Sequence, residues 1–288
     1  MNEYVIFADS GCDIKRSLLG EWNVPFESLT YKFDDSDKIY INDEIPAKDF
    51  YQKMRDGGVA KTSAVNPDTF KSAFEAIFNE GKDILYLGFS SGLSTTFNSA
   101  RIALNDLKDD YPDRRFAAID TLGASAGIGI LIRIALDKQA EGLSLEDNAA
   151  YIESIKLNLC HWFTVDDLVY LKRGGRVSPA AAFFGNMIGI KPVLHVDNEG
   201  HLVPVSKVRG RKTALAAMAD KYGELALDKE NGLVYISHSD CEADAQALGD
   251  MLAERYGASV SIITDVGPVI GAHSGPGTLA LFFLGNER

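Results

Sequence analysis

The sequence predicts an α/β protein with two domains: a parallel three-layer α/β/α domain over residues 1–157 and a mixed-sheet α/β domain over residues 158–288. In the first half, short apolar runs alternate with helical periodicity, which is typical of parallel strands covered by helices on both faces. In the second half, a hairpin signal adds antiparallel pairing. A length of 288 residues is also long for one hydrophobic core, which favours two domains.

Each predicted strand of the first half leads into a predicted helix. Residues 4–8 form an apolar run that ends at Asp9-Ser10-Gly11, and a helical stretch follows as far as Trp22. Residues 84–87 form the second strand, and the helix after it places apolar residues three or four positions apart at 97, 100, 104 and 107, as one buried face requires. Residues 116–119 form the third strand, before a glycine-punctuated helix that runs through Leu136.

The second half contains the predicted mixed sheet. Residues 162–165 lead into an arginine-rich segment, after which Ser178-Pro179 is expected to open a helix, with serine as the cap and proline in the first turn. Two strands, 191–196 and 201–208, flank the turn at 197–200. The remaining predicted elements are a helix through Met218, a strand at 233–237, a helix at 243–256 and strands at 260–264 and 279–284.

Composition excludes several classes of function. The chain has 29 lysines and arginines against 41 acidic residues, a net charge of −12 that repels nucleic acids and anionic membranes. We expect no membrane span because no apolar run reaches eighteen residues, and no signal peptide because the start lacks a basic region. A cytoplasmic location and reduced thiols at Cys12, Cys160 and Cys241 follow from this interpretation. The five histidines lack metal-binding spacing, so we expect no metal site.

Three segments contain the residue types of a polar ligand site. Residues 267–277 place His273 in a predicted rigid loop with four glycines and two prolines. Residues 61–65 and 90–96 are rich in hydroxyls, which satisfy the lone pairs of a carboxylate without an ion pair. Ser94 precedes a predicted helix, where backbone N–H groups favour an anion, although helix capping also explains a serine there. Capping equally explains part of the Thr62-Ser63 cluster, which precedes Asn66-Pro67-Asp68.

These three segments, together with residues 8–13 and 171–178, resemble the DegV family of fatty-acid-binding proteins, in the order and approximate spacing of that family. The resemblance implies a two-domain protein that encloses one long-chain fatty acid between and within its domains and needs no other cofactor. It also implies that the protein is not itself an enzyme. A separate ATP-dependent kinase subunit, of the DhaL-domain type, would phosphorylate the presented carboxylate to an acyl phosphate for phospholipid synthesis.

The same resemblance assigns the residues of the carboxylate site. Thr62 and Ser94 match the positions that hold the carboxylate, and His273 matches the histidine that supports them. Arg176 matches an arginine beside the head group, and the planar guanidinium of arginine suits carboxylates. Ser63 and Ser91 are second candidates. The sequence departs from the family at Thr95, where members often have glycine, and a β-branched residue there is expected to narrow the loop.

Two further features concern the acyl chain and the partner. Apolar runs at 180–188 and 281–284 could line a tunnel, although such runs are more often plain core. Arg209 and Arg211 belong to a basic cluster on an otherwise acidic chain, which favours a docking surface for an acidic partner or for nucleotide phosphates.

A hydrolase is the main alternative. Residues 88–92 fit the G-x-S-x-G pattern after a strand, with Ser90 as nucleophile, His273 as base, and Asp120 or Asp265 as the orienting acid. Five hydroxyls in seven residues, with no oxyanion segment before them, favour binding over nucleophilic attack. A small-molecule sensor without a partner enzyme is the third interpretation. The chain lacks a phosphate-binding loop for ATP and the kinase signature motifs.

Overall fold

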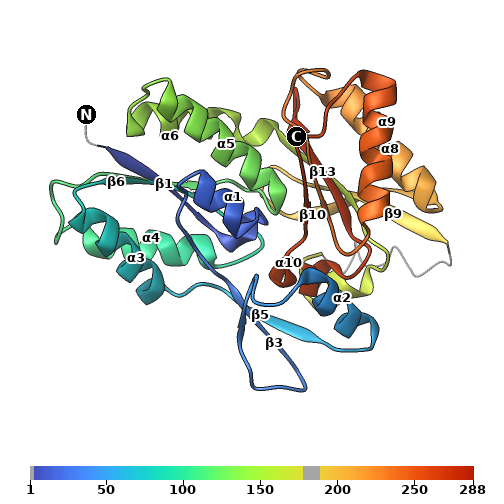
Figure 1. Ribbon diagram of the computed structural model, residues 1–288, viewed down its shortest axis with the longest axis horizontal. Helices are drawn as coiled ribbons and strands as arrows, with labels where there is room; N and C mark the ends of the chain where they lie inside the picture. The colour runs from blue at the N-terminus through green and yellow to red at the C-terminus, as the bar shows by residue number, and fades with distance from the viewer. Residues whose placement is uncertain (1–2, 178–188) are drawn as a thin grey trace.

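The computed structural model describes residues 3–177 and 189–288, and it contains the two predicted sheets side by side (Figure 1). The first sheet is parallel throughout and has the strand order β2-β1-β6-β7. Three of its strands are the predicted ones, and the edge strand β2 had no signal in the sequence. Their bounds are β1 (Tyr4–Asp9), β2 (Phe26–Glu27), β6 (Asp83–Gly88) and β7 (Phe116–Asp120).

Helices cover both faces of this sheet, which confirms the predicted α/β/α layers (Figure 1). One face carries α3 (Pro67–Asn79) and α4 (Thr96–Leu107), and the other carries α5 (Ala126–Ala140) and α6 (Leu145–Ile155). The buried face of α4 includes the predicted positions 97, 100, 104 and 107. The short helix α1 (Arg16–Glu21) follows the 3₁₀ turn η1 (Ser10–Cys12), as the helical stretch to Trp22 predicted.

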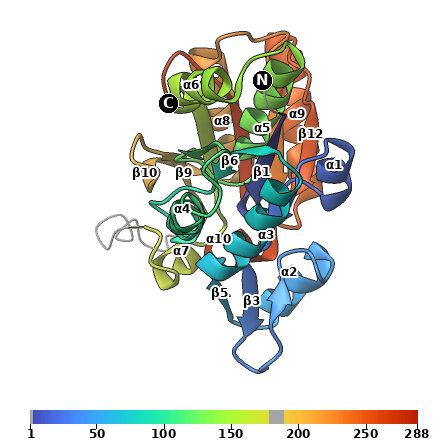
Figure 2. The ribbon, with the colours of Figure 1, turned by 90° about the vertical axis from the view of Figure 1, so that its left-hand side faces the viewer.

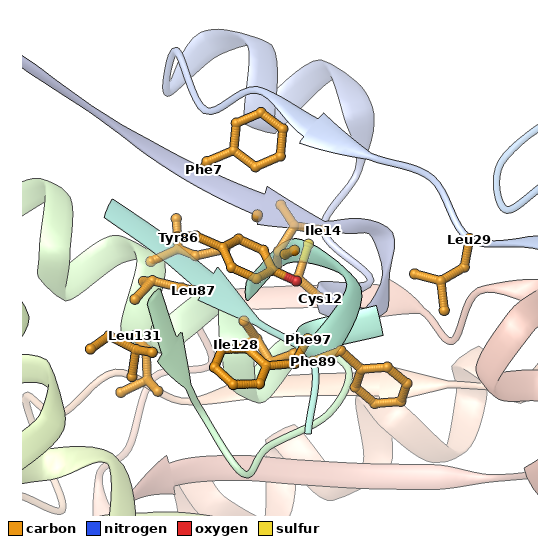
Figure 3. Packing of buried hydrophobic residues seen from close by; sticks show 14 of the residues in the cluster. Phe7, Cys12, Ile14, Leu29, Tyr86, Leu87, Phe89, Phe97, Ile128 and Leu131 are labelled. Atoms are coloured by element: carbon orange, nitrogen blue, oxygen red, sulfur yellow. The ribbon is translucent and has the colours of Figure 1, made fainter. Parts of the chain in front are cut away.

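The core of the first half is aromatic, with Tyr86 lying between Phe7 and Phe97 (Figure 3). The Tyr86 hydroxyl donates to Oδ2 of Asp9 at 2.6 Å, and the backbone N–H groups of Phe89 and Gly11 also donate to this carboxylate at 2.9 Å. Burial raises the pKa of Asp9. Asp9, at the carboxyl end of β1, therefore ties that end to the loop after β6 instead of facing a ligand.

The second sheet is mixed, as predicted, with the strand order β10-β9-β8-β13-β11-β12. All neighbours pair antiparallel except β11 and β12, and the predicted turn at 197–200 joins β9 to β10. Helices α8 (Arg211–Leu225) and α9 (Glu242–Tyr256) lie on its outer side (Figure 1). The strands are β8 (Leu159–Thr164), β9 (Ile190–Val196), β10 (Leu202–Arg209), β11 (Tyr235–His238), β12 (Ile262–Asp265) and β13 (Leu279–Leu284).

A third, small sheet was not predicted. Strands β4 (Tyr40–Ile41), β3 (Thr30–Phe33) and β5 (Ala60–Ser63) pair antiparallel in that order. Together with α2 (Ala47–Arg55) they form a projection below the two large sheets (Figures 1 and 2). Both β3 and β5 contact α10 (Pro268–Ser274), so the projection is joined to the second half of the chain.

Some local predictions need correction or fall outside the described residues. The segment around His273 is not a loop, because residues 268–274 form the helix α10 with Pro268 in its first turn. Thr62 and Ser63 do not cap α3, since they lie in β5 and the side chain of Asn66 accepts the Thr69 N–H instead. The helix expected at Ser178 and the apolar run 180–188 lie outside the described residues.

Candidate functional site

A cavity of about 510 Å³ lies between the six-stranded sheet and the loops of the first half. Its floor is formed by one face of β8 and β13, where Phe163 and Ala280 are paired neighbours and His161 pairs with Phe282. Of the predicted tunnel run 281–284, only Phe282 lines the cavity, because Leu281 and Phe283 point to the other side of the sheet and join the core under α8 and α9.

The predicted carboxylate-site residues line this one cavity. Thr62 and Ser63 come from β5, Ser91 and Ser94 from the loop before α4, Arg176 from the turn after α7 (Val169–Arg173), and His273 from α10. These residues are separated by up to 211 positions in the sequence, yet they line one cavity, and Ser63 and Ser91 among them are exposed. We call Thr62, Ser94, Arg176 and His273 the head end.

His273 is held neutral and bonded to Thr62. Its Nε2 lies 2.8 Å from Oγ1 of Thr62, and its Nδ1 has no hydrogen-bond partner among the described residues. Burial, together with the smaller effect of the Arg176 charge, lowers the pKa of His273 to about 4. At neutral pH the imidazole therefore carries one proton, and with that proton on Nε2 it donates to Thr62. The Thr62 hydroxyl is then free to donate to an anion.

Arg176 supplies positive charge beside this pair. Its Nε donates to the carbonyl oxygen of Leu93 at 3.2 Å, and its NH1 donates to the carbonyl oxygen of Gly174. The first bond joins Arg176 to the loop that carries Ser94. Gly174 itself is needed for close approach, because a Cβ there would lie 2.2 Å from Nδ1 of His273. Arg173, by contrast, is exposed and stacks over the ring of Tyr170.

Ser94 lies at the start of α4 and combines capping with a position on the cavity wall. Its Oγ accepts the Thr96 N–H at 3.2 Å and lies 2.9 Å from Oγ1 of Thr96. Thr95 is exposed and lines the cavity, and its φ of −78° is one that any residue adopts. The threonine therefore introduces no backbone strain where the family often has glycine.

Comparison with known proteins gives the family. A family model described as an uncharacterised protein family, DegV, matches residues 3–286. The chain belongs to the DegV family. A DegV domain-containing protein of Clostridium perfringens is 39% identical over 289 residues, which cover 100% of this chain and 99% of that protein. A Thermotoga maritima protein named as a fatty acid-binding protein is 32% identical over 280 residues, or 95% of each chain.

Solved structures of DegV proteins share the fold. A Thermus thermophilus DegV family protein described by its fatty acid binding superposes with a TM-score of 0.88 at 30% identity, covering 99% of this chain and 100% of that one. DegV from Bacillus subtilis, described as a fatty acid binding protein, gives a TM-score of 0.86 at 26% identity, with the same coverage. These matches confirm the predicted family and the predicted fold class.

The hydrolase alternative lacks its nucleophile in this DegV structure. Ser90 is fully buried, and its hydroxyl donates to the carbonyl oxygen of Gly200 at 2.9 Å while accepting the Gly92 N–H. Asp120 accepts the N–H groups of Ser91 and Leu122, and the Nε2 of His273 is occupied by Thr62. Ser90 thus fastens its loop to the β9–β10 hairpin, and backbone groups occupy its hydroxyl instead of a catalytic base.

The predicted docking arginines lie away from the cavity and differ from each other. Arg209 ends the edge strand β10 and is exposed. Arg211 begins α8, and its Nε lies 2.9 Å from Oδ2 of Asp244, with Asp166 at 3.8 Å from its NH1. The acids that neutralise Arg211 come from distant parts of the chain, which is why sequence reasoning did not find them.

Sequence reasoning missed the residues at the closed end of the cavity, chiefly His161. Its Nε2 accepts the Ala124 N–H at 3.1 Å, so the ring proton is on Nδ1 and points to the carbonyl oxygen of Leu159. Burial lowers the pKa of His161, and the ring packs edge-on against Phe282. His161 is therefore a neutral wall residue. The alternation of His161 and Phe163 along β8 was its only signal.

Other expectations from composition concern metals, membranes and thiols. No group of His, Cys, Asp and Glu that could hold a metal ion occurs within residues 3–177 and 189–288. Over the same residues, no helix is long and apolar enough to cross a membrane. Cys12, Cys160 and Cys241 are free thiols.

Proposed function

We propose that this protein binds one long-chain fatty acid, with the carboxylate at Thr62, Ser94 and His273 and the acyl chain along β8 and β13. The observation that carries the proposal is that one cavity is lined both by the hydrogen-bonding groups of the head end and by Phe163, Phe282 and other apolar side chains. Each buried methylene contributes about 0.8 kcal/mol, so an enclosed chain binds far better than one in a surface groove.

Ser63 and Arg176 complete the proposed carboxylate site. Ser63 is exposed at the edge of the cavity and offers a further hydroxyl donor. Arg176 keeps its charge next to the site while its N–H groups hold the Ser94 loop. The ligand would lie between the predicted domains 1–157 and 158–288, because Thr62 and Ser94 belong to the first and His273 to the second.

We further infer that the protein is the lipid-carrying partner of a separate ATP-dependent kinase of the DhaL-domain type, acting in the cytoplasm. The exposure of Ser63, Ser91 and Thr95 supports this role, because it leaves the carboxylate end of the cavity open to a partner, whereas buried Phe282 and His161 close the other end. The carrier would present the carboxylate, and the kinase would supply ATP and the phosphoryl transfer that forms the acyl phosphate.

The binding proposal is tested by organic extraction of the purified protein followed by mass spectrometry. We expect a long-chain fatty acid in the extract, and a rise in melting temperature when oleate or palmitate is added to delipidated protein, because a ligand that binds only the folded state stabilises it by mass action. An empty extract together with an unchanged melting temperature would show that the carrier proposal is wrong.

The kinase proposal needs its own experiment. Loaded protein is incubated with ATP and a DhaL-domain kinase, and acyl phosphate is trapped with hydroxylamine. We expect product only when both proteins are present. Product formed from free fatty acid by the kinase alone would remove the carrier from the reaction.

A further inference from the structure

The wall of the cavity contains three serine hydroxyls that the carboxylate site does not use. Ser274, Ser237 and Ser125 all line the cavity, and they come from α10, β11 and the residue before α5. Their neighbours on the wall include Phe163, Ala280 and Phe282. We call these three serines the hydroxyl stripe. A saturated acyl chain offers no hydrogen-bond partner to such groups.

Ser274 is the clearest sign of a missing partner. The residue is 5% exposed, and its Oγ has no hydrogen-bond partner within the described part of the chain. Its carbonyl oxygen, by contrast, accepts the hydroxyl of Thr278 at 3.0 Å. A buried hydroxyl without a partner costs free energy that a suitable ligand group recovers.

Ser237 and Ser125 form a pair backed by a carboxylate. The Ser125 hydroxyl donates to Oδ2 of Asp13 at 2.6 Å, and the two serine oxygens are 3.0 Å apart. When Asp13 is ionised, the Ser125 hydroxyl donates to it, so the hydroxyl of Ser237 donates to Ser125 and both lone pairs of Ser237 remain free to accept. This pair is therefore a preformed acceptor for a hydroxyl on a ligand.

The backbone at Ser125 supports a role for its side chain. Its φ of 55° and ψ of −150° lie in a region that glycine adopts far more readily than serine. A glycine there would relieve the strain but would remove the hydroxyl that connects Asp13 to Ser237.

Strand register gives the order of these groups along the cavity. Thr278, which bonds to Ser274, lies two residues before Ala280, and Ala280 pairs with Ser237. Two residues of an antiparallel strand span about 7 Å. Two residues further on, Phe282 pairs with His161 at the closed end. Ser274 thus lies nearer the head end, on the same helix as His273, and the Ser237–Ser125 pair lies beside the middle of the acyl chain.

We propose that the cavity selects long-chain fatty acids that carry a hydroxyl group within the chain, held by the Ser237–Ser125 pair, with Ser274 as a second polar contact closer to the carboxylate. This proposal rests on the proposed function, because it assumes a fatty acid with its carboxylate at the head end. It narrows the substrate class from fatty acids in general to those with a mid-chain hydroxyl.

The test compares delipidated wild-type protein with Ser237→Ala and Ser274→Ala, using octadecanoic acid and a set of hydroxyoctadecanoic acids that differ only in hydroxyl position. We expect one mid-chain isomer to bind wild type about tenfold more tightly than octadecanoic acid, and we expect Ser237→Ala to bring the ratio of these two affinities close to one. Ser274→Ala, which leaves the Asp13 network intact, should alter the preference among isomers hydroxylated nearer the carboxylate. Ser206→Ala, an exposed serine of β10, is the matched control.

The outcomes separate this inference from the proposed function. If octadecanoic acid binds wild type and every hydroxylated isomer binds more weakly, with the same ratios in both variants, the hydroxyl stripe does not recognise the ligand and only the inference is wrong. If no fatty acid of either kind binds wild type, the proposed function is wrong and the inference with it. Should Ser237→Ala fail to fold, the isomer preference of wild type and of Ser274→Ala still decides the question.

Discussion

The head end differs from the two buried carboxylates Asp9 and Asp13 in how many of its hydrogen-bonding groups remain free to bind a ligand. Asp9 accepts three hydrogen bonds, and Asp13 accepts the Ser125 hydroxyl and the Gly267 N–H. At the head end, His273 is the one side-chain hydrogen-bond partner of Thr62 within the described residues. The carboxylates thus serve the fold, whereas the head end keeps donors for an anion.

The largest expected effect comes from removing hydroxyls at the head end. Thr62→Val combined with Ser94→Ala should weaken fatty acid binding by a factor of roughly 100 or more, because each hydroxyl that donates to a charged group contributes roughly 1.5–3 kcal/mol. Displacement of a fluorescent fatty acid measures the loss, and Ser206→Ala serves as the control. Unchanged affinity in the double variant would place the carboxylate elsewhere.

Asp9→Asn should act on stability and not on affinity. Whichever way the new amide is turned, its nitrogen faces a backbone N–H, of Gly11 or of Phe89, which then loses its acceptor. We expect the free energy of unfolding, measured in urea, to fall by about 2 kcal/mol. The folded variant should still bind fatty acid normally. A loss of affinity without a loss of stability would show that Asp9 serves ligand binding and not the fold.

The contribution of Asp13 to the stability of the protein depends on pH. Burial raises its pKa to about 7, so between roughly pH 4 and pH 7 the folded protein retains a proton that the unfolded chain releases. The contribution of Asp13 to stability therefore falls as pH rises through this window. The free energy of unfolding of Asp13→Asn, relative to wild type, should increase by on the order of 2 kcal/mol from pH 5 to pH 8. Urea denaturation at both pH values checks this, and a difference that stays constant contradicts it.

A smaller effect is expected at the surface arginines. Arg209→Ala should slow kinase-dependent acyl phosphate formation a few-fold at low salt, since rim charges mainly govern association rates, and should leave bound fatty acid unchanged. Arg211→Ala is the comparison variant, because it breaks the ion pair with Asp244 and should mainly lower the melting temperature. If Arg209→Ala and Arg211→Ala are combined and the folded protein loses its bound lipid, these residues belong to the binding site instead.

The smallest effect is expected for Ser90→Ala. We expect no hydrolysis of a p-nitrophenyl ester above background in wild type and none in the variant, with fatty acid affinity unchanged, because the Ser90 hydroxyl bonds to the Gly200 carbonyl. Ester turnover that disappears with this substitution would revive the hydrolase interpretation.

Local signals were sufficient for elements with strong periodicity. Strand β13 was predicted at its observed bounds, and α9 to within one residue, because both combine a clear apolar pattern with turn residues at their ends. The small sheet was missed because β4 has only two residues and its pairing with β3 is not encoded in either strand alone. Helix α10 was missed because the glycines and prolines of residues 267–277 are typical of a turn.

The residues of the candidate site also fall into two groups, those predicted from the sequence and those that were not. Thr62, Ser94, Arg176 and His273 were found by resemblance, through motifs that each stand next to a predicted element. Ser125, Ser237 and His161 were not found, since their places on the cavity wall depend on pairing between strands and on a backbone conformation that no motif marks. The ion pairs of Arg211 with Asp244 and Asp166 were hidden for the same reason.

Thr62 belongs neither to the parallel sheet nor to the six-stranded one. It lies on β5, an edge strand of the small projecting sheet, and pairs there with Tyr31. A carboxylate held jointly by Thr62, Ser94 and His273 would bridge three separately supported parts of the chain, so its departure would loosen the joint between them. The amide protons of β3 and β5 should therefore exchange faster in the empty protein, and the projection would report to a partner whether the carrier is loaded.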